Sequence, residues 1–117
     1  MTPRELAVLR ATLERGADIR LAPNVFAALG SLRVIGGCGC GCESLDFVEH
    51  DPQRPSRPIA HGTGTTPAGG DVGLIVWGTD EAVVGLEVYD LGAGQQDIKL
   101  PLEDSVRPFV AGESTAR

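Results

Sequence analysis

Two runs of β-prone apolar residues on either side of a short polar stretch constrain the fold more than any other feature of this sequence. The runs are Val72–Trp77 and Ala82–Tyr89, and residues 78–81 between them read Gly-Thr-Asp-Glu. Turn-forming residues between two such runs are typical of an antiparallel hairpin with a short loop. The sequence therefore predicts a hairpin at the centre of a β-sheet.

Alternation within the second run predicts which face of the sheet is buried. Leu86 and Val88 share one face with the other even-numbered residues of the run, whereas Glu87 shares the opposite face with Val83 and Tyr89. Because successive side chains of a strand point to opposite faces, the first set is expected to meet the core. The second face is expected to be at least partly exposed to solvent.

The N-terminal third of the chain has helical spacing instead. Thr2 and Glu5 have the spacing of a capping box, and the proline between them suits the first helical position. Apolar residues then recur at helical intervals as far as Gly16, so residues 3–15 are predicted to form an amphipathic helix. A second, short helix is predicted over residues 23–29.

Three further strands are expected, at Leu32–Ile35, Cys40–Glu49 and Asp97–Leu100. Together these elements predict the α+β class, with N-terminal helices packed on one face of a mainly antiparallel sheet of four or five strands. The length of 117 residues suits a single domain over 1–117. Residues 51–71 are rich in proline and glycine and are expected to form a long loop, and residues 110–117 a loose tail.

Composition narrows the partners and the compartment. The net charge of −6 repels phosphate backbones, so nucleic acid is not expected as a partner. No apolar run approaches the length of a membrane span, and the charged N-terminus does not resemble a signal segment. A single lysine, Lys99, beside many arginines, alanines and glycines suggests a bacterial genome rich in G and C. A soluble protein of the bacterial cytoplasm is expected.

The most unusual local feature is the run Cys38-Gly39-Cys40-Gly41-Cys42. In a regular strand the three thiols share one face, with alternate residues about 6.5 Å apart. Zinc holds its sulfur ligands at ~2.3 Å, so a straight strand cannot wrap three thiolates around one ion. A bend at the glycines is required for the sulfurs to converge.

A bent run of this kind suggests a thiol or metal site. Zinc needs a fourth ligand, for which His50, His61, Glu43 and Asp46 are the candidates, whereas Cu(I) accepts two thiolates. The candidate ligands are Cys38, Cys40, Cys42, His50 and His61. No cofactor is expected otherwise, and zinc and Cu(I) are the ions that such a cluster would bind.

Two other interpretations of the cysteines remain open. In one, the thiols are small buried hydrophobic groups, and glycines alternate with them because a helix approaches the strand closely. In the other, a cysteine is a nucleophile with His50 or His61 as its base, although no known nucleophile signature surrounds it. No catalytic residue is assigned, and the chain is not expected to be an enzyme.

The segments Gly37–Phe47 and Val84–Asp90, followed by Leu100-Pro101, resemble a loose group of small bacterial proteins. These proteins share a strand with a Cys-x-Cys-Gly-Cys-like segment and a late strand that ends in Leu-Glu-Val-Tyr. The resemblance covers roughly residues 23–102 and implies the α+β fold. No activity is established for the group, and Pro52–Asp71 departs from its pattern as an insertion.

The expected function is therefore that of a non-enzymatic module. We expect it to bind a protein partner, or to self-associate, through an exposed strand or sheet face. The alternative is a thiol- or metal-binding protein that uses Cys38, Cys40 and Cys42.

Overall fold

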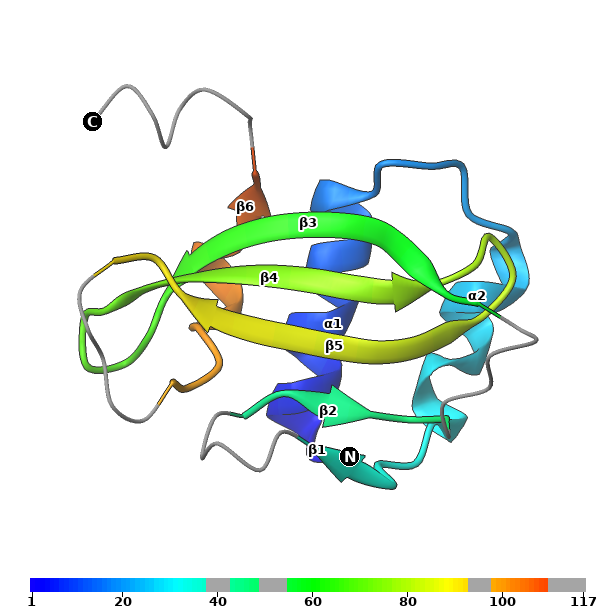
Figure 1. Ribbon diagram of the computed structural model, residues 1–117, viewed down its shortest axis with the longest axis horizontal. Helices are drawn as coiled ribbons and strands as arrows, with labels where there is room; N and C mark the ends of the chain where they lie inside the picture. The colour runs from blue at the N-terminus through cyan, green and yellow to red at the C-terminus, as the bar shows by residue number, and fades with distance from the viewer. Residues whose placement is uncertain (38–42, 49–54, 93–97, 110–117) are drawn as a thin grey trace.

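The computed structural model describes residues 1–37, 43–48, 55–92 and 98–109 as two helices that cover one face of an antiparallel sheet (Figure 1). The helices are α1 (Pro3–Gly16) and α2 (Pro23–Ala28), and short 3-10 turns occupy Leu29–Ser31 and Glu103–Ser105. The strands are β1 (Gly36–Gly37), β2 (Leu45–Asp46), β3 (Arg57–Thr65), β4 (Asp71–Gly78), β5 (Val83–Asp90) and β6 (Arg107–Pro108). The predicted α+β class, with helices on one face of the sheet, is confirmed.

Helix α1 begins at the predicted capping box. The Thr2 hydroxyl accepts the backbone N–H of Glu5 at 3.1 Å, and the Glu5 carboxylate accepts the backbone N–H of Thr2 at 2.6 Å. These two bonds satisfy donors that a helix start otherwise leaves open. The buried side of the helix includes Val8, Leu9 and Leu13, which have essentially no exposed surface. The predicted amphipathic helix is therefore confirmed, and α2 lies where the second helix was predicted.

The sheet order is β1-β2-β5-β4-β3-β6, and every neighbouring pair is antiparallel. The predicted hairpin is β4–β5, and it does occupy the centre of the sheet. Among the described residues the sheet has six strands, against the four or five expected, because pairings of only two residues form β1, β2 and β6. The register shifts between Trp77 and Gly78, and this irregularity buries Val83, which simple alternation had placed on the exposed face.

The prediction of a loop over residues 51–71 is wrong, because β3 occupies Arg57–Thr65. The apolar alternation is missing because the core-facing positions hold small residues: Ala60, Gly62 and Gly64 are buried. A Cβ on Gly64 would lie 2.6 Å from the Cβ of Pro101, so only glycine fits under that segment. A turn at residues 66–70 then joins β3 to β4, with Gly69 at a φ of 93°.

Two of the other strand predictions also differ from the structure. Residues 32–35 and 98–100 form no ladder, although Ile35 donates one backbone bond to Asp46 and Ile98 accepts one from Glu43. The described part of the predicted strand 40–49 contains only β2. The tail predicted at 110–117 and the cysteines lie outside the described residues.

Candidate functional site

The face of the sheet opposite the helices carries the side chains that are best placed to meet a partner. On the helix side, positions such as Leu74, Val76 and Leu86 are fully buried. The alternate positions are only partly buried, and in Figure 1 the helices lie behind them. We call this surface the open face and define it by these residues: Asp46, His61, Thr63, Ile75, Trp77, Glu87 and Tyr89.

Strand register arranges these side chains in rows across the sheet. One row runs from His61 through Ile75 to Glu87, and a second from Trp77 across Gly85 to Asp46. Neighbouring strands lie about 5 Å apart, so Glu87 and His61 are separated by roughly 10 Å with Ile75 between them. The centre of the open face is thus an isoleucine flanked by two ionisable side chains.

The ring of Tyr89 covers Gly73, its partner on β4. A Cβ built on Gly73 would lie 2.1 Å from the ring carbon Cζ, so the ring occupies the space that a side chain would take. Burial raises the pKa of the Tyr89 hydroxyl above its ordinary value of 10.0, and the negative charge of Glu87 adds to that rise. Tyr89 is therefore a neutral aromatic group that covers Gly73 near a carboxylate.

Trp77 and Glu87 are joined across the two central strands. The indole Nε1 of Trp77 donates to Oε1 of Glu87 at 3.2 Å. Asp46 lies on β2, two strands from Trp77 and on the same side of β4 as Glu87, and its Oδ1 is 3.5 Å from the position that a Cβ on Gly85 would take. An indole ring thus lies in a row with one carboxylate and is bonded to another. We call Asp46, Trp77 and Glu87 the acid–indole group.

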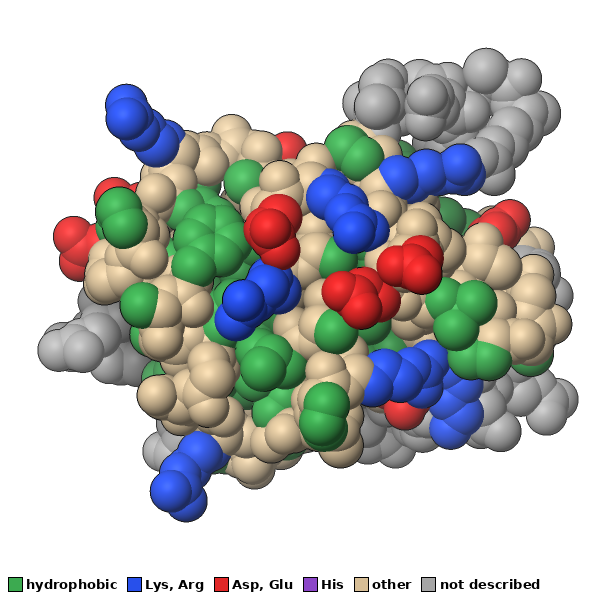
Figure 2. Space-filling model, turned by 180° about the vertical axis from the view of Figure 1, so that it is seen from behind, with side chains coloured by type: hydrophobic (Ala, Val, Ile, Leu, Met, Phe, Trp, Pro, Cys, Tyr) green, Lys and Arg blue, Asp and Glu red, His purple; other side chains and the backbone are tan. Residues whose placement is uncertain are grey.

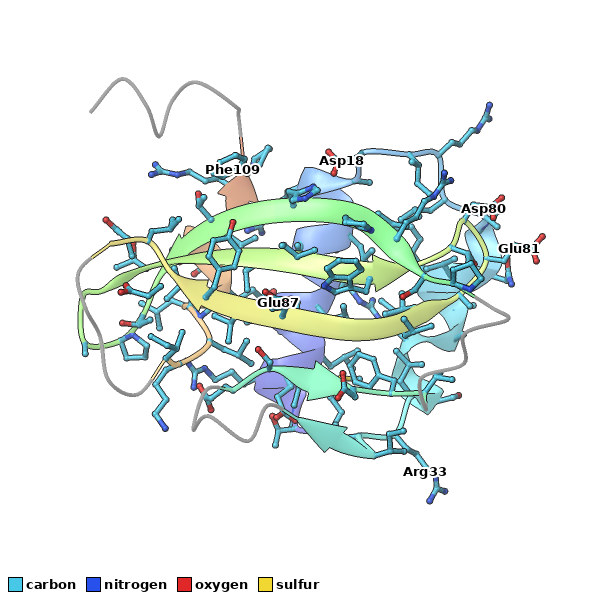
Figure 3. All side chains as sticks on the ribbon, viewed as in Figure 1. Asp18, Arg33, Asp80, Glu81, Glu87 and Phe109 are labelled. Atoms are coloured by element: carbon cyan, nitrogen blue, oxygen red, sulfur yellow. The ribbon has the colours of Figure 1, made fainter. Side chains whose placement is uncertain are left out.

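His61 and Asp18 form a pair at the far border of the open face. The Nδ1 of His61 donates to the carboxylate of Asp18, with 32% and 48% of the two side chains exposed. The residues meet because the chain leaving α1 runs along β3: Ala17 bridges to Ala60, and the Asp18 N–H bonds to the Ile59 carbonyl at 2.9 Å. Figure 3 shows Asp18 beyond the edge of β3 and Glu87 in the middle of β5.

The structure places only one of the five predicted metal ligands. His61 lies on β3 with Asp18 as its carboxylate neighbour, whereas Cys38, Cys40, Cys42 and His50 lie outside the described residues. Within the ranges that the structure describes, no three His, Cys, Asp or Glu side chains come together as metal ligands. The proposed thiol site therefore stays a prediction.

The helix-covered side of the molecule has a different surface. Figure 2 shows that its hydrophobic side chains are scattered among acidic and basic ones. Within the described part of the chain, no helix is both long enough and apolar enough to cross a membrane. Comparison with protein-family models, with curated proteins and with solved structures finds no match. The candidate site therefore depends on the geometry of the open face alone.

Sequence reasoning placed Glu87 and Tyr89 on the exposed face but gave them no role. Trp77 was recognised only as the last residue of the first apolar run, and Asp18 was not singled out. The signal for Glu87 and Tyr89 was the alternation of β5, whereas the partnership of Trp77 with Glu87 depends on the register between β4 and β5, which a single sequence does not reveal.

Proposed function

We propose that the protein is a non-enzymatic binding module that docks a partner protein on the open face. The observation that carries the proposal is that the aromatic and apolar side chains Ile75, Trp77 and Tyr89 are half-buried together on a face that no described helix covers. Aromatic groups with a polar tip are enriched at protein interfaces because they combine contact area with hydrogen bonding. Trp77 and Tyr89 are such groups.

Charge favours a different protein as the partner over a second copy of this chain. The chain has a net charge of −6, and the open face includes the carboxylates of Asp46 and Glu87. Two copies that met face to face would bring like charges together as water is removed, which is unfavourable. A partner segment with positive charge meets the same surface with complementary charge. The same net charge argues against nucleic acid, and we expect this role in the bacterial cytoplasm.

Selection from a random peptide library tests the proposal directly. Purified protein is used as the bait, selected peptides are synthesised, and their affinities are measured by calorimetry. We expect peptides whose binding shifts the backbone resonances of Thr63, Ile75 and Glu87. Peptides that shift only other surfaces, or a library that yields no binder, would show that the open face is not a docking surface.

A matched pair of isoleucine variants distinguishes specific contact at the open face from nonspecific hydrophobic binding elsewhere on the surface. Ile75→Thr keeps a β-branched residue in the strand but removes apolar contact at the centre of the open face. Ile35→Thr makes the same change at a residue that is 54% exposed and lies before β1. We expect Ile75→Thr to weaken the selected peptides by roughly fivefold or more, and Ile35→Thr to leave them unchanged.

Analytical ultracentrifugation distinguishes a different partner protein from a second copy of this chain as the molecule that binds the open face. We expect a monomer at micromolar concentration. A dimer that Ile75→Thr dissociates and Ile35→Thr does not would identify the open face as a self-association surface and would overturn the proposal of a different partner.

A further inference from the structure

We propose that the acid–indole group is a binding site for an arginine side chain of the partner. This inference rests on the proposed docking function and names the chemical group that the open face recognises. Asp46, Trp77 and Glu87 come from three adjacent strands, β2, β4 and β5, so the sheet itself holds them in place. Three features favour a guanidinium group as the ligand: the Glu87 carboxylate forms no ion pair among the described residues, the Trp77 ring is fixed by a hydrogen bond, and Asp46 supplies a second carboxylate.

Glu87 is a half-buried carboxylate that forms no ion pair with any residue that the structure describes. Across the described residues, the ion pairs are Arg4 with Glu43 and His61 with Asp18, and neither involves Glu87. Its hydrogen bond comes from the neutral indole of Trp77. A partly desolvated carboxylate is stabilised most by a cation that also donates hydrogen bonds. The centre of the sheet therefore offers a binding site for positive charge.

The hydrogen bond to Glu87 also fixes the indole ring of Trp77. With Nε1 directed to Glu87, the ring cannot rotate freely, and it stays next to the carboxylate. Tryptophan has the most favourable ring face for a cation, and a guanidinium stacks on it while its N–H groups reach a nearby carboxylate. An ordered ring beside a carboxylate is already arranged for this contact, which lowers the entropic cost of binding.

Asp46 places a second carboxylate at the far end of the row that runs from Trp77 across Gly85. Gly85 carries no side chain between Trp77 and Asp46, and Asp46 itself is exposed. A planar guanidinium has five N–H donors, so it can bond to two carboxylates and still stack on the ring. A lysine ammonium is a compact point charge that does not stack. The combination of two acids with one indole therefore favours arginine over lysine.

The test uses the wild-type protein and two peptides that differ in one group. Acetyl-Gly-Arg-Gly-amide carries the guanidinium, and acetyl-Gly-citrulline-Gly-amide replaces it with a neutral group of the same shape. The chain has one tryptophan, so its indole N–H resonance and its fluorescence report on Trp77 alone. We expect the arginine peptide to shift both signals to saturation, with an affinity roughly tenfold or more above that of the citrulline peptide. Because this comparison changes only the ligand, it does not depend on how any variant folds.

Matched variants place the binding at the acid–indole group. Glu87→Gln keeps an oxygen that accepts the Trp77 N–H but removes the charge, and we expect it to weaken the arginine peptide roughly fivefold. Asp46→Asn should weaken it less, because Asp46 is more exposed. Glu81→Gln removes the same charge in the β4–β5 turn, where Figure 3 shows Glu81, and should have no effect.

The outcomes separate this inference from the proposed function. Equal binding of the two tripeptides, or saturable binding that Glu87→Gln leaves unchanged, would contradict the proposed arginine-binding site. Library peptides that bind the open face but tolerate citrulline in place of every arginine would contradict the proposed arginine-binding site while supporting the docking function. If no peptide contacts the open face, the docking function itself is wrong. Equal affinity for a lysine tripeptide would show a general cation site, which also contradicts the inference.

Discussion

The ring of Tyr89 lies over Gly73, so the only tyrosine of the chain takes the place of the side chain that its cross-strand neighbour lacks. Glycine inside a strand is otherwise unfavourable, because it packs nothing against its neighbours. An aromatic ring across the ladder covers that backbone and supplies the missing contact. This pair stabilises the same sheet face that we propose as the docking surface.

Gly73→Ala should displace the Tyr89 ring. The new Cβ would lie 2.1 Å from Cζ, and the ring can swing away only by giving up its contact with β4. We expect a loss of about 1 kcal/mol in the free energy of unfolding, measured by urea denaturation. In a Tyr89→Ala background the same substitution should cost less, since there is no ring to displace.

Gly30→Ala is the control for the added methyl group. A Cβ on Gly30 has nothing within 4 Å, so this variant should be neutral or slightly stabilising. Equal effects of Gly73→Ala and Gly30→Ala would contradict the placement of Tyr89 over Gly73.

Glu87→Gln should lower the pKa of Tyr89 without restoring it to 10.0. Burial is the larger cause of the raised pKa and the charge of Glu87 the smaller, so removing the charge leaves the burial effect in place. The absorbance of tyrosinate follows this group alone, because the chain has one tyrosine. An unchanged midpoint in Glu87→Gln would contradict the proximity of the carboxylate to the ring, and Glu81→Gln is the matched control.

The raised pKa of Tyr89 also predicts a dependence of stability on alkaline pH. Its folded pKa lies above the unfolded value of about 10, so the folded state holds the proton more tightly. The stabilisation is fully present below pH ~10 and is lost as pH rises through the folded pKa. Tyr89→Phe should therefore lose stability less steeply than the wild type above pH ~10, in urea denaturation at a series of pH values. Parallel pH profiles would contradict this linkage.

Much of the fold could be predicted from patterns that lie close together in the sequence. The capping box at Thr2 and Glu5 and the hairpin around residues 78–81 depend on neighbours within a few positions, and both formed as expected. Strand β3 was missed because Ala60, Gly62 and Gly64 fill its core-facing positions, which removes the alternation by which strands are recognised. Other segments come close to Gly62 and Gly64 and leave little room for a side chain, and that approach is a property of the folded chain.

The candidate site was predictable only in part, for a similar reason. Alternation placed Glu87 and Tyr89 on one face, but the pairing of Trp77 with Glu87 depends on a register that is shifted by an irregularity at Gly78. The contact of His61 with Asp18 joins residues separated by 43 positions and depends on how the chain leaves α1. No local pattern marks such a contact.

Glu43 is predicted to stabilise the fold as a hydrogen-bond acceptor more than as a charge. Its Oε1 accepts the backbone N–H of buried Leu100 at 2.6 Å, while the guanidinium of Arg4 lies 4.0 Å away and also donates to the Leu100 carbonyl. Glu43→Gln keeps an oxygen for that N–H, and the ion pair is partly exposed, so we expect a cost below about 1 kcal/mol. Glu43→Ala leaves the N–H without this acceptor and should cost about 1–3 kcal/mol. Glu14→Ala, at an exposed position of α1, is the control, and all three are measured by urea denaturation.

The close contact between the end of α1 and β3 predicts the most damaging glycine substitution. A Cβ on Gly16 would lie 2.0 Å from the carbonyl oxygen of His61, which is backbone and cannot swing aside as a tyrosine ring can. The helix end must move away from the strand, and this movement breaks the Ala17–Ala60 bridge and separates Asp18 from His61. We expect Gly16→Ala to lose about 2 kcal/mol or more in the free energy of unfolding. Asp18→Asn, which disturbs only the exposed side-chain pair, should lose less than about 1 kcal/mol. Equal losses in the two variants would show that the backbone contact at Gly16 does not determine how α1 packs on the sheet.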